Sequence, residues 1–171
     1  MNKFTKGFAV LASIILLSAC GGDSMTKGDD GDSQNGGADS SGMYGGGSFD
    51  GHPLDNPSGM LSKRIVYFAF DSSEVKYDDR EVIATHASYL SNNPDARVTL
   101  EGHADERGSR EYNIGLGERR TNAVKKLMTL QGTSNSQLES VSYGEERPVD
   151  SGHNESAWSQ NRRVEIIYTR R

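Results

Sequence analysis

Arg120 is the residue whose position most strongly indicates a binding function. It falls in the middle of an apolar stripe that repeats at helical spacing. The stripe consists of Leu116, Ala123, Val124 and Leu127. A guanidinium stays protonated in proteins, and burying it without a partner is very unfavourable. We therefore expect an anionic partner, either the carboxylate of Asp71 or Asp105 within the protein or a ligand carboxylate held bidentately.

Asp105 is the second residue that indicates binding, because it lies in a polar loop between an expected strand and an expected helix. The loop runs from Gly102 to Glu111, and ligands often bind where the strands of an α/β layer end. A carboxylate on one side and the guanidinium of Arg120 on the other would complement the ammonium and carboxylate groups of an amino acid. Charge-assisted hydrogen bonds contribute about 1.5–3 kcal/mol each, so a few of them give micromolar binding.

The histidines and their acidic neighbours offer an alternative, a metal site or a hydrolase, which their spacing does not favour. The candidates are His103, Asp105, Glu106 and His153. The sequence contains no zinc motif of the His-Glu-x-x-His type and no Gly-x-Ser-x-Gly elbow. We therefore expect no enzymatic activity, no metal and no cofactor. Trp158 and the tyrosines are expected to belong to the core rather than to a ligand platform.

The elements that position these residues follow from the hydrophobic pattern. Strands are expected at residues 64–70, 97–101, 140–143 and 163–168. One helix is expected to begin after an N-cap at Asp78 or Asp79 and to end at Asn92-Asn93-Pro94; a second is expected from Asn113 to Gln131, with Gly132 as its C-cap. This order predicts an α+β fold, a two-layer α/β sandwich in which a βαβα-ββ mixed sheet carries helices on one face.

Composition divides the 171-residue chain into two parts. Most of its 20 glycines lie in the first third, and without residues 1–60 about a hundred residues remain, enough for one core. The net charge is −5, and no basic stripe is present that would neutralise phosphates. Nucleic acid is therefore not expected as a partner.

The N-terminus has the features of a lipoprotein signal. Two lysines precede a short apolar run, residues 8–17, which is too short to span a bilayer as a helix. The run leads into Leu17-Ser18-Ala19-Cys20, which resembles the lipobox of bacterial lipoproteins, and this cysteine is the only one in the chain. We expect residues 1–19 to be cleaved as a signal peptide and Cys20 to carry the lipid. Gly21, rather than aspartate, follows the cysteine, which points to the outer membrane.

Residues 20–62 are expected to comprise the lipidated cysteine and a flexible linker rich in Gly, Ser and Asp, followed by a folded domain at residues 63–171. Apolar side chains are few in the linker and show no period. A coil of about forty such residues has an r.m.s. span of roughly 35 Å and a fully extended length of about 130 Å. Its acidic residues lack the spacing of a calcium-binding loop. We therefore interpret it as a solvated tether.

Several motifs, in the same order, make residues 63–170 resemble the OmpA-like family of peptidoglycan-binding domains. They are Gly102-His-Ala-Asp-Glu-Arg-Gly108, Tyr112-Asn113, Leu116-Gly-Glu-Arg-Arg120, Ser142-Tyr-Gly-Glu-Glu-Arg-Pro148 and Trp158-Ser-Gln-Asn-Arg-Arg-Val164. The lipobox and the linker are similar to those of lipoproteins in this family. The resemblance implies the same βαβα-ββ sandwich that the pattern predicts.

The resemblance also implies a site for the diaminopimelate residue of the peptidoglycan stem peptide. Asp105 matches the residue that holds the amino group of the diaminopimelate side chain, and Arg120 matches the arginine that holds its carboxylate. The other matched positions in this site are Phe70, Asp71, Asn113 and Leu116. A lipoprotein with such a site would tether the outer membrane to the cell wall.

The family further implies a protein partner, the periplasmic β-propeller protein TolB of the Tol system. Two departures from the family pattern concern the site. Ala69 stands where these lipoproteins often carry aspartate. Gly115 and Gly117 lie near the start of the second expected helix, where each costs about 0.5–1 kcal/mol relative to alanine. These glycines either soften the helix start or allow close approach of a ligand.

Overall fold

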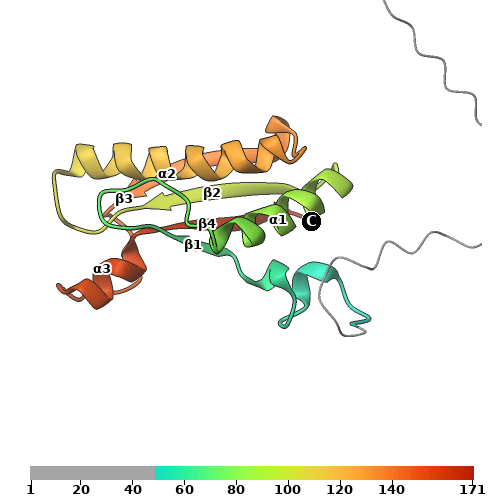
Figure 1. Ribbon diagram of the computed structural model, residues 1–171, viewed down its shortest axis with the longest axis horizontal. Helices are drawn as coiled ribbons and strands as arrows, with labels where there is room; N and C mark the ends of the chain where they lie inside the picture. The colour runs from blue at the N-terminus through green and yellow to red at the C-terminus, as the bar shows by residue number, and fades with distance from the viewer. Residues whose placement is uncertain (1–48) are drawn as a thin grey trace, which may run out of the picture. The chain divides into compact units, whose positions relative to one another are not determined.

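The computed structural model describes residues 49–171, in which four strands form one mixed sheet (Figure 1). The strands are β1 (Ile65–Tyr67), β2 (Arg97–His103), β3 (Leu138–Gly144) and β4 (Arg163–Arg170). Their order in the sheet is β1-β4-β2-β3, with β4 antiparallel to both β1 and β2, and β2 parallel to β3. The expected signal peptide, Cys20 and most of the expected linker lie outside the described residues.

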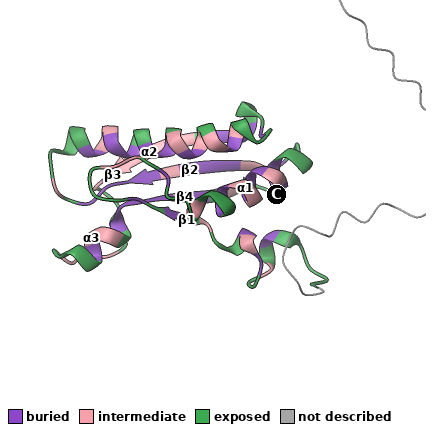
Figure 2. Cartoon of the chain, viewed as in Figure 1, coloured by how far each residue is buried: buried purple, intermediate pink, exposed green. Residues whose placement is uncertain are grey.

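Three helices accompany the sheet: α1 (Asp79–Asn92), α2 (Arg110–Leu130) and α3 (Glu155–Asn161). The buried side of α2 faces the sheet, and its outer side is exposed (Figure 2). The core lies between α1, α2 and one face of the sheet. Its main members are Ile83, Leu90, Val124 and Met128 from the helices and Val66, Val98, Leu100, Val164 and Ile166 from the strands. The α+β fold predicted from the hydrophobic pattern is confirmed.

None of the helices within residues 49–171 combines the length and the hydropathy needed to cross a membrane. Both long helices begin close to where the sequence predicts. Helix α1 starts after Asp78, although that side chain makes no capping hydrogen bond. Helix α2 starts three residues earlier than expected, because Ser109 Oγ accepts a hydrogen bond of 3.2 Å from the backbone N–H of Tyr112. Gly132, after the end of α2, has a φ of +98°.

The first strand is shorter than the predicted range of residues 64–70. It ends at Tyr67, and Phe68 makes one further backbone hydrogen bond, from its N–H to the carbonyl oxygen of Arg162 at 2.9 Å. The chain then turns, with Asp71 at a φ of +50° in the left-handed region that aspartate tolerates. The residues expected at the end of this strand therefore form a loop, and that loop borders the site described below.

Helix α3 replaces part of the loop that the sequence predicts before the last strand. It has seven residues, and Asn154 caps it by accepting a hydrogen bond of 3.1 Å from the N–H of Ala157. Seven residues contain only two helical turns, which is too short for a hydrophobic period to stand out. Asn154, whose residue type favours the N-cap position, is the feature of the sequence that indicates the start of this helix.

The folded part begins before residue 63, the expected boundary of the linker. Two short 3-10 turns, Pro53–Asp55 and Met60–Ser62, bring Leu54 and Leu61 into the core. Their exposed fractions are 3% and 2%. Arg64 secures the first turn by donating a hydrogen bond of 2.8 Å from Nη2 to the carbonyl oxygen of Leu54. Two isolated leucines in a polar, glycine-rich stretch gave no periodic signal from which this packing could be predicted.

Candidate ligand-binding site

A pocket of about 210 Å³ opens where the loop after β1, the loop after β2 and the first turns of α2 meet. The six residues that the sequence and the family resemblance assign to ligand binding all line it. They are Phe70, Asp71, Asp105, Asn113, Leu116 and Arg120. The fold therefore brings together residues that lie up to fifty positions apart in the chain.

Three further residues line the same pocket and were not among the predicted ligand residues: Arg107, Gly108 and Tyr112. Gly108 has a φ of +117°, a conformation that favours glycine, and it turns the loop toward the start of α2. Tyr112 donates a hydrogen bond from its hydroxyl group to Asp71. All three belong to the motifs quoted above, so the signal was present in the sequence, but nothing in the hydrophobic pattern placed them in the pocket.

Arg120 is fully buried, as the apolar stripe predicts, but it pairs with carbonyl oxygens rather than with a carboxylate. Its Nε donates to Ser72 O at 2.8 Å, its Nη1 to His103 O at 2.7 Å and its Nη2 to Ala69 O at 3.1 Å. Phe68 packs against the guanidinium, 5.2 Å from its carbon to the ring centroid. Within residues 49–171, Arg120 makes no ion pair, so the expected internal partner is not found there.

The three hydrogen bonds leave the charge of Arg120 without a direct counter-ion among the described residues. Burial lowers the pKa of this guanidinium to about 10, while the nearby carboxylates of Asp105 and Asp71 oppose that shift. Of its five N–H groups, three are used by the carbonyl oxygens, which leaves two. The pocket therefore presents a cation that remains able to receive an anion.

The same hydrogen bonds fix the shape of the pocket. Two of the three carbonyl oxygens belong to Ala69 and Ser72, which flank Phe70 and Asp71 in the loop after β1. The third belongs to His103, at the end of β2. Arg120 thus positions the loop that carries Phe70 and Asp71 and the start of the loop that carries Asp105. Ala69, where the family often has aspartate, takes part through its backbone.

Asp105 is 4% exposed and is already engaged by two arginines. Arg107 donates to it from Nε at 3.1 Å and from Nη2 at 2.7 Å, and Arg162 donates from Nη1 at 3.1 Å. Burial acts to raise the pKa of Asp105, but the hydrogen bonds from Arg107 and Arg162 outweigh it and hold the pKa below its usual value. Asp105 is therefore ionised at neutral pH.

Asn113 and Leu116 form the wall contributed by α2. Asn113 is 1% exposed and donates from its side-chain amide to the carboxylate of Glu145. Leu116 supplies the apolar part of this wall and is also buried. On the opposite side, Phe70 is 57% exposed and Asp71 is exposed at the rim. The pocket therefore combines a fixed, buried floor with an accessible edge.

The residues considered for a metal site or a hydrolase do not form one cluster in the described part of the chain, although His153 and Glu106 contact each other. The imidazole of His103 lies outside the pocket lining, next to Tyr143 with a ring distance of 5.6 Å. His153 and Trp158 both bond to Glu106, which is exposed. No group of three metal-ligating side chains occurs in the described part of the chain. Trp158 is partly buried and lies outside the core cluster in which it was expected.

Comparison with known proteins gives a consistent result over most of the chain. The model of the OmpA family matches residues 67–162. The "Peptidoglycan-associated lipoprotein" of Pseudomonas aeruginosa is 45% identical, covering 97% of this chain and 98% of that protein. The protein of the same name from Haemophilus influenzae is 37% identical, covering 98% of this chain and 100% of that protein. These names describe an association rather than a reaction, in agreement with the expectation that the chain is not an enzyme.

Solved structures extend the comparison to the fold. The crystal structure of the peptidoglycan-associated lipoprotein from Burkholderia pseudomallei has a TM-score of 0.68 and 43% identity, covering 68% of this chain and 99% of that chain. The C-terminal domain of Helicobacter pylori MotB has a TM-score of 0.56 at 22% identity, covering 61% of this chain and 81% of that chain. The second likeness concerns the fold alone.

Proposed function

This chain belongs to the OmpA family, and from that premise we propose that it is an outer-membrane lipoprotein that binds peptidoglycan noncovalently. The ligand group in this proposal is the diaminopimelate residue of the stem peptide, which enters the pocket of Arg120 and Asp105. Arg120 receives its carboxylate and Asp105 its ammonium group. Lipid on Cys20 holds the other end of the chain, so the protein tethers the outer membrane to the cell wall.

The observation that carries this proposal is the state of Arg120. Its guanidinium is buried, three carbonyl oxygens hold it in place, and no carboxylate of residues 49–171 pairs with it. A buried cation that lines a pocket favours an anionic ligand, because a charge-assisted hydrogen bond contributes about 1.5–3 kcal/mol. A ligand carboxylate would provide the counter-ion that residues 49–171 do not.

The charge distribution of the pocket also favours a zwitterionic ligand. Two carboxylates, Asp71 and Asp105, line it together with Arg107 and Arg120. The side-chain end of diaminopimelate carries one ammonium and one carboxylate group, whereas lysine at the same position would carry the ammonium alone. A site that uses both charges would therefore discriminate between cell walls of the two types.

Sedimentation with purified cell walls tests this function. We expect the wild-type protein to sediment with walls of the diaminopimelate type and to be released by a soluble stem tripeptide that ends in diaminopimelate. The tripeptide that ends in lysine should not release it. Arg120→Ala and Asp105→Ala should remain in the supernatant. Equal sedimentation of these variants and the wild type would rule out the site.

Two further variants keep this test decisive if a buried substitution impairs folding. Asp71→Asn changes an exposed residue of the pocket and should weaken wall binding severalfold while leaving thermal unfolding unchanged. Arg110→Ala removes the same charge as Arg120→Ala from an exposed position outside the pocket lining, where Arg110 pairs with Glu146. It should bind walls like the wild type.

The proposed tether joins Cys20 to the folded part. Because the turn that starts at Pro53 already belongs to the folded part, the tether would comprise residues 21–52. Its fully extended length would be roughly 110 Å. Replacing Cys20 with serine tests the lipid anchor, and we expect this variant to move from the membrane fraction to the soluble fraction. An unchanged membrane fraction would contradict lipidation at Cys20.

The proposed partner protein is TolB of the Tol system, which would link the tether to cell division and envelope integrity. If TolB covers the pocket of Asp105 and Arg120, it and peptidoglycan compete for the same surface. Saturating muropeptide should then lower the apparent affinity of the protein for TolB. An unaltered affinity would show that the two partners use separate surfaces.

A further inference from the structure

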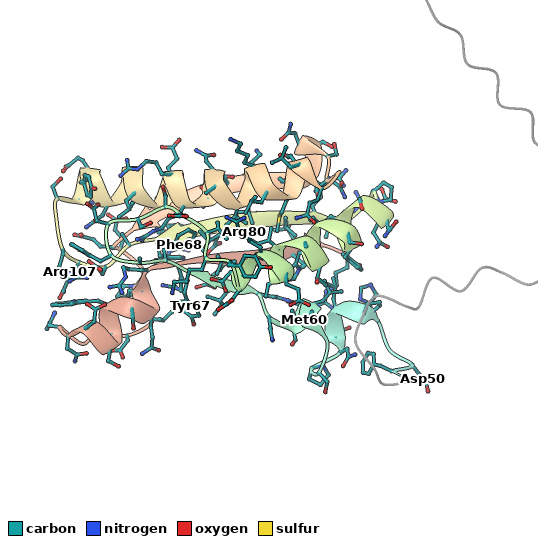
Figure 3. All side chains as sticks on the ribbon, viewed as in Figure 1. Asp50, Met60, Tyr67, Phe68, Arg80 and Arg107 are labelled. Carbon is teal, nitrogen blue, oxygen red and sulfur yellow. The ribbon has the colours of Figure 1, made fainter. Side chains whose placement is uncertain are left out.

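We propose that Arg107 occupies, in the free protein, the place that the ligand's ammonium group takes in the complex. Binding then exchanges one cation for another at Asp105, and the rings of Phe70 and Trp158 form the walls of this cation subsite. The proposal rests on the proposed function, and it assigns roles to Arg107 and Trp158 that the sequence did not predict. Arg107 lies where the loop between β2 and α2 faces α3 (Figure 3).

The hydrogen bonds of Asp105 leave no place for an additional donor. Its Oδ1 accepts from the backbone N–H and from Nε of Arg107, both at 3.1 Å. Its Oδ2 accepts from Arg107 Nη2 at 2.7 Å and from Arg162 Nη1 at 3.1 Å. A carboxylate offers about four acceptor positions, so all of them are in use. An incoming ammonium group can bind Asp105 only if one of these donors leaves.

Arg107, rather than Arg162, is the donor that can leave. The Arg162 side chain is 7% exposed, and it also bonds to the carbonyl oxygen of Phe68 at 3.1 Å and to Glu155 at 2.6 Å. The Arg107 side chain is 30% exposed, and its other polar contact is a longer one of 3.5 Å to Glu155. Rotation of the Arg107 side chain breaks two bonds to Asp105 and leaves the backbone bond in place.

The space that Arg107 would vacate is suited to another cation. The carbon of its guanidinium lies 4.0 Å from the ring centroid of Phe70 and 4.2 Å from that of Trp158. Aromatic faces attract cations of either the guanidinium or the ammonium type. Trp158 is itself held by a hydrogen bond of 2.8 Å from Nε1 to Glu106. Departure of Arg107 would therefore expose a carboxylate beside two aromatic rings.

The exchange conserves the charge balance at Asp105, because one cation replaces another. The charged residues that line the pocket are Asp71, Asp105, Arg107 and Arg120, whose charges sum to zero. When Arg107 turns away, Asp105 loses the positive charge of that guanidinium, and the ammonium group of the ligand replaces it there, while the ligand carboxylate pairs with Arg120. A ligand that offers only a carboxylate could pair with Arg120 but would give Asp105 no replacement for Arg107.

Calorimetric titration of two stem tripeptides, each with three proteins, tests the exchange. One tripeptide ends in diaminopimelate, and the other ends in 2-aminopimelate, which lacks the side-chain amino group. We expect Arg107→Ala to bind the diaminopimelate tripeptide about tenfold more tightly than the wild type, since a competing state that is 90% populated lowers apparent affinity by that factor. Its affinity for the 2-aminopimelate tripeptide should be unchanged. Arg110→Ala, with the same loss of charge three residues away, should match the wild type with both ligands.

The other outcomes of this titration overturn the proposal. If Arg107 instead binds the ligand carboxylate, Arg107→Ala will weaken the binding of both tripeptides. If Arg107 only supports the loop, Arg107→Ala will change the affinities for the two tripeptides equally or leave both unchanged. Failure of the wild type to bind the diaminopimelate tripeptide would remove the proposed function and this inference with it, whereas wild-type binding without the selective gain would remove the inference alone.

Nuclear magnetic resonance of the Arg107 side chain gives an independent reading of the exchange. Its Nε–H group donates to Asp105 in the free protein and should give a protected, resolved signal. Saturation with the diaminopimelate tripeptide should abolish that protection, and the 2-aminopimelate tripeptide should preserve it. A protected signal in both complexes would mean that Arg107 remains on Asp105, contrary to the proposal.

Discussion

Gly102 of β2 and Gly117 of α2 bring the backbones of the strand and the helix into direct contact beside the pocket. A Cβ atom added to Gly117 would lie 2.9 Å from the carbonyl oxygen of Gly102 and would collide with Ser142 Oγ. A Cβ added to Gly102 would meet the Gly117 carbonyl group and Thr121 Cγ2, the latter at 2.8 Å. This contact sets the distance at which Arg120, one turn further along α2, reaches the carbonyl oxygen of His103.

Gly117→Ala is therefore expected to destabilise the protein by about 1–3 kcal/mol, the usual range for overpacking a core. The measurement is the free energy of unfolding in urea. Gly115→Ala is the matched control, because its added Cβ would meet only the flexible end of Arg119 at 3.4 Å. At that helical position alanine should stabilise the protein by about 0.5–1 kcal/mol. Equal effects of the two substitutions would contradict the proposed role of Gly117.

These two glycines also illustrate what the sequence could predict. The destabilising effect of Gly115 and Gly117 on the helix follows from residue type alone. The sequence left open whether these glycines soften the helix start or allow close approach of a ligand. The structure assigns the close approach at Gly117 to β2 instead. A backbone contact between residues far apart in the sequence cannot be predicted in this way, because no local pattern indicates which strand a helix will contact. By contrast, the burial of Arg120 was predictable from helical spacing.

Arg120→Lys tests whether this residue acts through its charge alone or also through the several N–H donors of its guanidinium group. A lysine ammonium is compact and cannot reach carbonyl oxygens in two separate loops, so at least one would lose its partner. Since an unsatisfied buried polar group costs about 1–3 kcal/mol, we expect a loss of about 2–4 kcal/mol in unfolding free energy. Arg119→Lys, the exposed neighbour, should change stability by less than about 0.5 kcal/mol. A loss below about 1 kcal/mol for Arg120→Lys would mean that its three hydrogen bonds contribute little.

The partner of Arg120 could not be derived from the sequence, for a physical reason. Carboxylates are visible as residue types, whereas the carbonyl oxygens of Ala69, Ser72 and His103 become available only where strands end and loops turn. The same holds for Arg107 and Trp158. Their stacking depends on α3, which the hydrophobic pattern did not predict. The pocket residues that resemble family motifs were found, and the contacts among them were not.

The stability of the protein should fall between pH 7 and pH 5 because two buried histidines resist protonation. Burial lowers the pKa of His86 to about 4, and burial together with Arg163 lowers the pKa of His103 to about 4. A histidine in the unfolded chain has a pKa near 6.5 and takes up a proton between pH 7 and pH 5. Protonation therefore stabilises the unfolded state relative to the folded state. Linkage gives a loss of about 2 kcal/mol per histidine at pH 5. The depressed pKa of Asp105 acts only below about pH 4 and does not contribute.

His103→Phe should remove one of these two contributions. The phenyl ring keeps the contact with Tyr143, and it replaces an imidazole whose two nitrogens have no hydrogen-bond partner among the described residues. Stability at pH 7 should be equal to or higher than that of the wild type. The difference between urea unfolding at pH 7 and at pH 5 should shrink by about half. An undiminished pH dependence would mean that His103 is protonated or solvated in the folded state.

Leu54 and Leu61 provide the test of where the folded part begins. If the domain began at residue 63, as the composition predicts, their replacement would leave stability unchanged. In the structure both side chains are buried in the core, so Leu54→Ala and Leu61→Ala should each reduce the unfolding free energy by about 2–4 kcal/mol. Leu130→Ala is the control, because Leu130 is 72% exposed at the end of α2 and should be nearly neutral. Neutral substitutions at both buried leucines would instead assign residues 53–62 to the tether and lengthen its reach.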